Sequence, residues 1–204
     1  MKASDAVFCV DWPCAEMDHA AFAVPGIDVD PQGVRLVLIA EVPPPDPADG
    51  LYAGPESLHA QTTLLAFRDG GLPVDSIEEL LRKGVYLTTA VKCGKPEYNL
   101  KSETVARCSR HLEQELDLFP GVRAYLLMGD VAIRAFNEIA RRRTGKRVIP
   151  AGSSYKLRGT TYMYGSARVF PSYLQAGKSF FIEQSKRRMI AEDIAGALAW
   201  TGIV

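Results

Sequence analysis

The order of apolar and polar positions along the chain predicts strands that alternate with helices. Short, unbroken runs of branched and large apolar residues are typical of strands buried on both faces of a parallel sheet. Such runs occur at residues 34–39, 85–91 and 124–128. Residues 148–169 alternate bulky and polar side chains around two glycines, which indicates a hairpin that leads into a fourth core strand.

Helix signals fill most of the segments between these strands. Capping residues before the apolar stretches and glycines after them predict where helices begin and end. Helices are predicted at residues 55–68, 77–83, 102–119, 130–143 and 183–200. Residues 1–30 follow no period, and residues 170–174 (Phe-Pro-Ser-Tyr-Leu) are predicted to form a loop.

Strands alternating with helices form right-handed crossover units, which place helices on both faces of a mostly parallel sheet. We therefore expect an α/β fold: a three-layer α/β/α sandwich around a central, mostly parallel four-stranded sheet. With 204 residues, 47% of them hydrophobic, the chain is long enough for one well-buried core. Residues 1–204 are expected to form a single domain, with residues 1–30 as an irregular segment.

The formal net charge is zero, but the charges are unevenly distributed. Residues 1–133 hold 11 Lys or Arg against 20 Asp or Glu, whereas residues 134–188 hold 13 against 2. The basic segment predicts a face that contacts phosphates. The alternative is that the clusters at 141–143 and 186–188 are solvated helix ends that complement helix dipoles.

No stretch approaches the roughly 20 apolar residues of a membrane-spanning helix. The N-terminus also lacks the positively charged and apolar segments of a signal peptide. We therefore expect a cytoplasmic protein that is not associated with a membrane. In that compartment, four cysteines are expected to be free thiols or metal ligands rather than disulfides.

Glu41 is the first candidate for chemistry. It directly follows the first predicted strand, and three prolines at residues 43–45 end that strand. Ligands of open α/β sheets bind outside the carboxyl ends of the strands. Alternatively, Glu41 merely ends a strand and turns to solvent. Asp46 and Asp49 lie close by in the sequence and are candidates to share the work of this carboxylate.

The four cysteines form two pairs, Cys9 with Cys14 and Cys93 with Cys108. Four thiolates with no spare cysteine fit a four-coordinate site, which holds either zinc or an iron–sulfur cluster. The alternative is four independent buried cysteines. The three histidines lie at no ligand-like spacing; they are His19, His59 and His111.

Several segments carry a family likeness. Residues 38–43 (Leu-Ile-Ala-Glu-Val-Pro) lead from a strand into a turn, and residues 85–93 end in Val-Lys-Cys. Residues 127–132 carry a glycine and an alanine at a predicted helix start, and residues 170–174 read Phe-Pro-Ser-Tyr-Leu. Together with the position of Cys108, these segments resemble, in order, motifs of the uracil-DNA glycosylase superfamily, nearest its iron–sulfur branch called family 4. The resemblance covers about residues 9–200 and implies that superfamily's fold.

The resemblance also implies a cofactor and an activity. The cofactor would be a [4Fe–4S] cluster with a structural role, and its ligands would be Cys9, Cys14, Cys93 and Cys108. Proteins of this family bind DNA, extrude a base from the stack and hydrolyse its N-glycosidic bond, as the first step of base-excision repair. They are usually monomers, which we expect here too.

Individual roles follow from the same resemblance. Glu41 matches the family's acidic residue, which would stabilise positive charge on the sugar. Tyr52 stands where the family has a Phe that stacks on the base. Tyr173 and Leu174 match the loop that enters the gap left by the flipped base.

Two further base-binding candidates differ from the family's residues. Thr89 replaces an Asn that reads uracil, and a hydroxyl offers fewer hydrogen bonds than an amide. Phe170 replaces a His that donates to the base in the transition state. The leading hypothesis is therefore a DNA-binding, uracil-DNA-glycosylase-like protein that excises uracil or another deaminated base. The alternatives are a catalytically inactive DNA- or nucleotide-binding module of the same fold, and a zinc or iron–sulfur protein with an unrelated small-molecule function.

Overall fold

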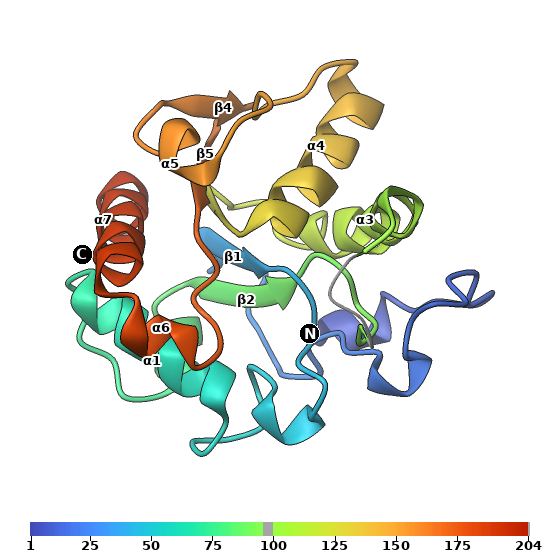
Figure 1. The fold of residues 1–204 in the computed structure, drawn as a ribbon, viewed down its shortest axis with the longest axis horizontal. Helices are drawn as coiled ribbons and strands as arrows, with labels where there is room; N and C mark the ends of the chain where they lie inside the picture. Colours follow the sequence, from blue (N-terminus) through green and yellow to red (C-terminus); the bar gives the residue numbers. More distant parts are fainter. Residues whose placement is uncertain (96–99, 204) are drawn as a thin grey trace.

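The computed structural model describes residues 1–95 and 100–203 and has three layers (Figure 1). The middle layer is a sheet with the strand order β2-β1-β3-β5-β4. Its strands are β1 (Leu36–Ala40), β2 (Val85–Thr89), β3 (Ala124–Met128), β4 (Tyr162–Tyr164) and β5 (Ala167–Ser172). Four of them are parallel, and only β4 pairs antiparallel, with β5. The expected three-layer α/β sandwich is confirmed. The sheet has five strands rather than the expected four, because the outer arm of the predicted hairpin is itself a strand, β4.

Helices cover both faces of the sheet, as Figure 1 shows. One face carries α3 (Ser102–Leu116) and α4 (Asp130–Thr144), whose apolar side chains pack on alternate strand residues. The other face carries α1 (Leu58–Asp69), α2 (Ile77–Arg82) and α7 (Gln184–Thr201). Each face thus has its own hydrophobic core, as a sheet buried on both sides requires.

Shorter helices complete the chain. Two single-turn α-helices are α5 (Ser154–Leu157) and α6 (Ser179–Ile182), and the 3₁₀ helices are Ala3–Asp5, His19–Ala21 and Pro47–Asp49. None of the helices in the described part of the chain is both long and apolar enough to cross a membrane.

Three predicted boundaries are wrong in detail. The helix predicted from residue 55 begins at Leu58, because Ser57 caps it by accepting the N–H of Ala60. The helix predicted to residue 119 ends at Leu116. Residues 170–172, predicted as loop, belong to β5.

The strand continues through Pro171 because β4 is short. The register of β4 on β5 ends at Val169, so beyond this residue β5 pairs only with β3. Pro171 lies opposite Leu127 at this open edge, where a residue without an N–H is tolerated.

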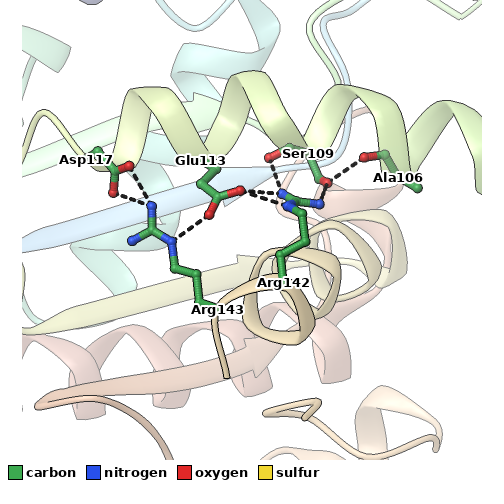
Figure 2. A network of polar contacts seen from close by, with 6 residues as sticks. All are labelled: Ala106, Ser109, Glu113, Asp117, Arg142 and Arg143. Carbon is green, nitrogen blue, oxygen red and sulfur yellow. Dashed lines mark hydrogen bonds and ion pairs between the residues drawn. The ribbon is translucent and has the colours of Figure 1, made fainter. Parts of the chain in front are cut away.

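An ion-pair network joins α3 to α4 on the outside of the molecule (Figure 2). The guanidinium of Arg142 donates to Glu113 and to the hydroxyl of Ser109. The neighbouring Arg143 donates to Glu113 and to both carboxylate oxygens of Asp117. Burial alone would raise the pKa of Glu113, but the two guanidinium groups hold that pKa below its usual value.

Such pairing is general in the basic segment. Eight of the 13 Lys and Arg residues at 134–188 form ion pairs with acidic side chains of the described chain. Much of the positive charge that distinguishes this segment is therefore balanced within the fold.

A second ion pair lies inside the protein, between the end of β2 and α3. Lys92 and Glu115 are fully buried, and their charged groups are in direct contact. The ammonium of Lys92 also donates to the hydroxyl of Thr88 (2.7 Å) and the carbonyl of Thr89 (2.6 Å). The Glu115 carboxylate accepts from Tyr86 (2.7 Å) and from Thr88 (2.9 Å). Both charges are thus paired and hydrogen-bonded, as buried charges must be.

Removing one member of this pair should destabilise the protein strongly. Lys92→Met leaves the Glu115 carboxylate buried without its counter-charge, so the free energy of unfolding should fall by about 3–5 kcal/mol. Adding Glu115→Gln removes the stranded charge and should recover most of that loss. Urea titrations followed by circular dichroism would measure both variants. A loss below about 1 kcal/mol for Lys92→Met, as for a surface pair, would contradict this account.

Candidate functional site

Two adjacent cavities open at the carboxyl ends of β1 and β2. The Tyr52 cavity, with a volume of about 230 Å³, is lined by Tyr52, Thr88 and Thr89 among others. The Glu41 cavity, with a volume of about 310 Å³, is lined by residues that include Glu41 and Leu174. Three side chains line both cavities: Pro43, Pro44 and His59. The two cavities therefore share a wall.

The main chain holds the carboxylate of Glu41 at the N-terminus of α4. Glu41 directly follows β1, and its Oε1 accepts the N–H of Val131 at 3.1 Å. The carboxylate lies against Gly129, where a Cβ atom would be 2.5 Å from Oε1. Gly129 also has φ +101° and ψ 170°, a conformation that is essentially restricted to glycine. A helix N-terminus is a favourable place for a negative charge.

Tyr52 closes the free edge of β2. Its hydroxyl donates to the carbonyl of Leu87 (2.7 Å) and accepts the N–H of the same residue (3.2 Å). Burial raises the pKa of Tyr52 well above its usual value, so the phenol stays neutral. The ring is thus held by the main chain at one end and by the hydrogen bonds of its hydroxyl at the other, while it lines the cavity.

The two threonines at the end of β2 have different environments. Thr88 is turned toward the buried pair and bonds to Lys92 and Glu115. Thr89 is 7% exposed, and its carbonyl, not its hydroxyl, is the group that accepts from Lys92.

His59 is a site residue that the sequence analysis missed. It lies on the buried side of α1, 5% exposed, and its Nε2 has no hydrogen-bond partner among the described residues. Burial lowers the pKa of His59 to about 4, and the nearby carboxylate of Asp49 opposes this only in part. The imidazole is therefore neutral at pH 7. The spacing of His59 from the other candidate residues did not indicate a site, because the two cavities that meet at His59 are formed by segments far apart in the sequence.

Asp49, rather than Asp46, reaches the site. Asp49 lines the Glu41 cavity, and its carboxylate accepts the N–H of Leu58 at the start of α1. Asp46 is exposed, and its carboxylate accepts the N–H of Ala48 in the adjoining turn.

The remaining predicted residues are divided between the site and the core. Leu174 lines the Glu41 cavity and is 37% exposed. Tyr173 is half-buried against the core, with the ammonium of Lys186 5.9 Å from its ring centre. Phe170 is buried between the sheet and α7, 7% exposed, with the guanidinium of Arg168 4.4 Å from its ring centre. The structure does not bring Phe170 together with Tyr52 and Thr89 at either cavity.

All four cysteines line one small pocket beside α3. Cys93 follows β2, Cys108 lies within α3, and Cys9 and Cys14 come from the irregular N-terminal segment. His19 and His111 line the same pocket, and the ring of His19 is 3.5 Å from the sulfur of Cys93. The irregular segment is thus placed against the body of the protein at these thiols.

The pocket gathers four thiols, and the environment of Cys93 and Cys108 disfavours their ionised form. Burial and the three neighbouring thiols raise the pKa of Cys93 to about 12. Burial likewise raises the pKa of Cys108, although the N–H of Lys92 donates to its sulfur at 3.2 Å. Thiolates so close together need a bound cation. Among the described residues, no three His, Cys, Asp or Glu side chains already stand at the spacing of a single-ion site.

Comparison with known proteins places the chain in a family. The model of the uracil DNA glycosylase superfamily matches residues 29–192, which include the whole lining of the Glu41 cavity and most of the lining of the Tyr52 cavity. The chain belongs to this superfamily. Over 114 residues it is 32% identical to the type-5 uracil-DNA glycosylase of Thermus thermophilus. The match covers 56% of this chain and 51% of that protein, so the chain spans about half the length of the relative it matches.

Gly129 should be indispensable for the position of Glu41. Gly129→Ala adds backbone strain and a clash with the carboxylate, so we expect a loss of about 2–4 kcal/mol in the free energy of unfolding. Gly145→Ala, at the other end of α4, is the control, because Gly145 has φ +74° but open space around its Cβ position. Strain alone should cost about 1–2 kcal/mol there. Equal losses in the two variants, measured by urea titration, would show that Glu41 does not need the close approach.

Proposed function

We propose that the protein is a DNA glycosylase that hydrolyses the N-glycosidic bond of uracil or another deaminated base. The observation that carries this proposal is the shared wall between the two cavities. A base flipped into the Tyr52 cavity would place its sugar at that wall, beside the carboxylate in the Glu41 cavity.

Glu41 is the group that we assign to the sugar. As the bond from C1′ to the base breaks, its electron pair leaves on the base and positive charge develops on the sugar. A fixed carboxylate stabilises that charge and orients the water whose oxygen bonds to C1′. The water gives up a proton to the carboxylate, and the departing base anion takes up a proton, so the products are neutral. The hydrogen bond from Val131 and the contact with Gly129 support this role, since they hold the carboxylate in place before the reaction.

Tyr52 and Thr89 are assigned to the base, and Leu174 to the DNA stack. The ring of Tyr52 offers a flat apolar face for stacking, and the hydroxyl of Thr89 a hydrogen bond. Leu174 is exposed at the rim of the Glu41 cavity, where an apolar side chain suits the gap that a flipped base leaves. Lys95 lines the same cavity and Lys178 follows its last residue, so both are assigned to phosphates.

The four cysteines are assigned to a [4Fe–4S] cluster with a structural role. The support is that all four line one pocket that joins the N-terminal segment to β2 and α3. One zinc ion is the alternative, since it too accepts four thiolates. When bound, either group would supply positive charge to the thiolates and tie Cys9 and Cys14 to the body.

Glu41→Gln tests the catalytic assignment. Single-turnover assays would offer single-stranded and duplex DNA with uracil, hypoxanthine or xanthine. We expect excision of at least one of these bases, and a loss of about 10²–10³-fold in its rate in Glu41→Gln, because the amide cannot stabilise positive charge. Binding, measured at several salt concentrations, should remain and should weaken as salt rises.

Two outcomes would contradict this proposal in different ways. Excision at an unchanged rate in Glu41→Gln would remove the carboxylate from the mechanism. Salt-dependent DNA binding without excision of any base would instead favour the inactive binding module.

The cofactor assignment is tested by metal analysis. Protein prepared without oxygen should contain iron and inorganic sulfide and absorb broadly in visible light, and Cys108→Ser should lose both. His111→Gln changes a side chain of the same pocket that is not a thiol, so it should retain the iron. One equivalent of zinc without iron would establish the alternative, and loss of iron in His111→Gln would contradict the four-cysteine ligand set.

A further inference from the structure

The Tyr52 cavity has few polar side chains that are available to a ligand. The hydroxyl of Tyr52 is engaged with Leu87, and that of Thr88 with the buried ion pair. Most other lining residues are Ala, Val, Pro, Gly or Leu. Among the described residues this leaves Thr89 and His59 as the polar side chains that face the cavity.

His59 is well placed to serve such a ligand. It lies on the wall between the Tyr52 and Glu41 cavities, and no described residue partners its Nε2. A buried ring nitrogen without a partner costs free energy, which a ligand would offset. The ring is carried by α1, whose next turn is tied to the 173–177 segment through the hydrogen bond from Gln175 to Thr63 (3.2 Å).

The chemistry of a neutral imidazole matches the edge of a deaminated base. One ring nitrogen donates and the other accepts. Deamination replaces an amino group with a carbonyl, so uracil, hypoxanthine and xanthine each present a carbonyl oxygen beside an N–H. When the glycosidic bond breaks, negative charge develops on such carbonyls. A preorganised neutral donor stabilises that charge and adds no charge of its own to the cavity.

We propose that His59 is the donor to a carbonyl oxygen of the flipped base, and that it reads the base and stabilises its departure. This inference rests on the proposed glycosylase function. Phe170, at the position of the family's donor, is packed in the apolar layer that α7 shares with the sheet, so here the donor would come from α1 instead.

The test compares leaving groups. His59→Leu removes the donor at similar volume, and the single-turnover rate on uracil should fall by about 10²-fold or more. DNA with 5-fluorouracil carries a base whose anion is already stabilised by fluorine, so the same variant should lose distinctly less there. His59→Gln keeps a donor and should recover part of the rate on uracil. Gln61→Leu, an exposed change on the same helix, is the control and should keep the wild-type rates.

Binding separates this inference from the proposed function. Non-cleavable DNA with 2′-fluoro-2′-deoxyuridine should bind wild-type protein more tightly than the same strand with 2′-fluoro-2′-deoxycytidine, whose amino group replaces a carbonyl, and His59→Leu should lose this preference. If wild-type protein shows the preference but excises no base, the proposed function fails and the role of His59 in reading the base is judged by binding alone. Equal loss of rate on uracil and 5-fluorouracil, or an unchanged preference in His59→Leu, would overturn the inference. If His59→Leu does not fold, as judged by its thermal melt, His59→Met, which also lacks a donor, carries the same comparisons. An equal loss on both bases or an unchanged preference overturns the inference, and a smaller loss on 5-fluorouracil supports it.

Discussion

The buried contact between Lys92 and Glu115 is the constraint on which both functional regions depend. Lys92 fixes the end of β2 from inside: its ammonium holds Thr88 and Thr89, which form the floor of the Tyr52 cavity. Its main-chain N–H donates to the sulfur of Cys108, and the next residue in the chain is a second thiol of the cysteine pocket. Breaking a buried ion pair costs much more than a surface pair contributes. The cavity floor and the thiols are therefore fixed relative to each other by one pair of charges.

Around this centre, the main chain rather than other side chains positions most reactive groups. The Glu41 carboxylate is held by a helix N-terminus, and the phenol of Tyr52 by the free edge of β2. Neither arrangement needs a second charged side chain. A ligand that enters the cavities thus meets a carboxylate and a phenol that are already held in place, which favours preorganisation over adjustment on binding.

Sequence patterns predicted the strands and helices well and the interior of the site less well. The strand at residues 124–128 is confirmed, because an unbroken apolar run of this length between turns is too short for a buried helix. The end of β5 was missed because Pro171 suggested a loop, and proline is tolerated there only because β4 is short. Glu41 is where its position after a strand predicted it to be. Lys92 was noted only as part of the Val-Lys-Cys segment, and Glu115 and His59 carried no pattern, because the importance of all three comes from contacts between distant segments.

Phe170 stands where the resemblance implies a His, and this difference changes which part of the fold supplies polar groups to the site. The alternation of β5 turns Phe170 toward α7, where it packs with Ile194 and close to Gly196. A polar side chain at this position would need a partner within an apolar layer. The aromatic ring completes that layer, so Phe170 contributes packing rather than chemistry. The polar groups around the two cavities come from the end of β1, the segment that leads to α1, α1 itself and the end of β2. His59 on α1 lies in the wall that the two cavities share, so under the proposed function the fold has no donor from β5 and still has a polar group between the two cavities.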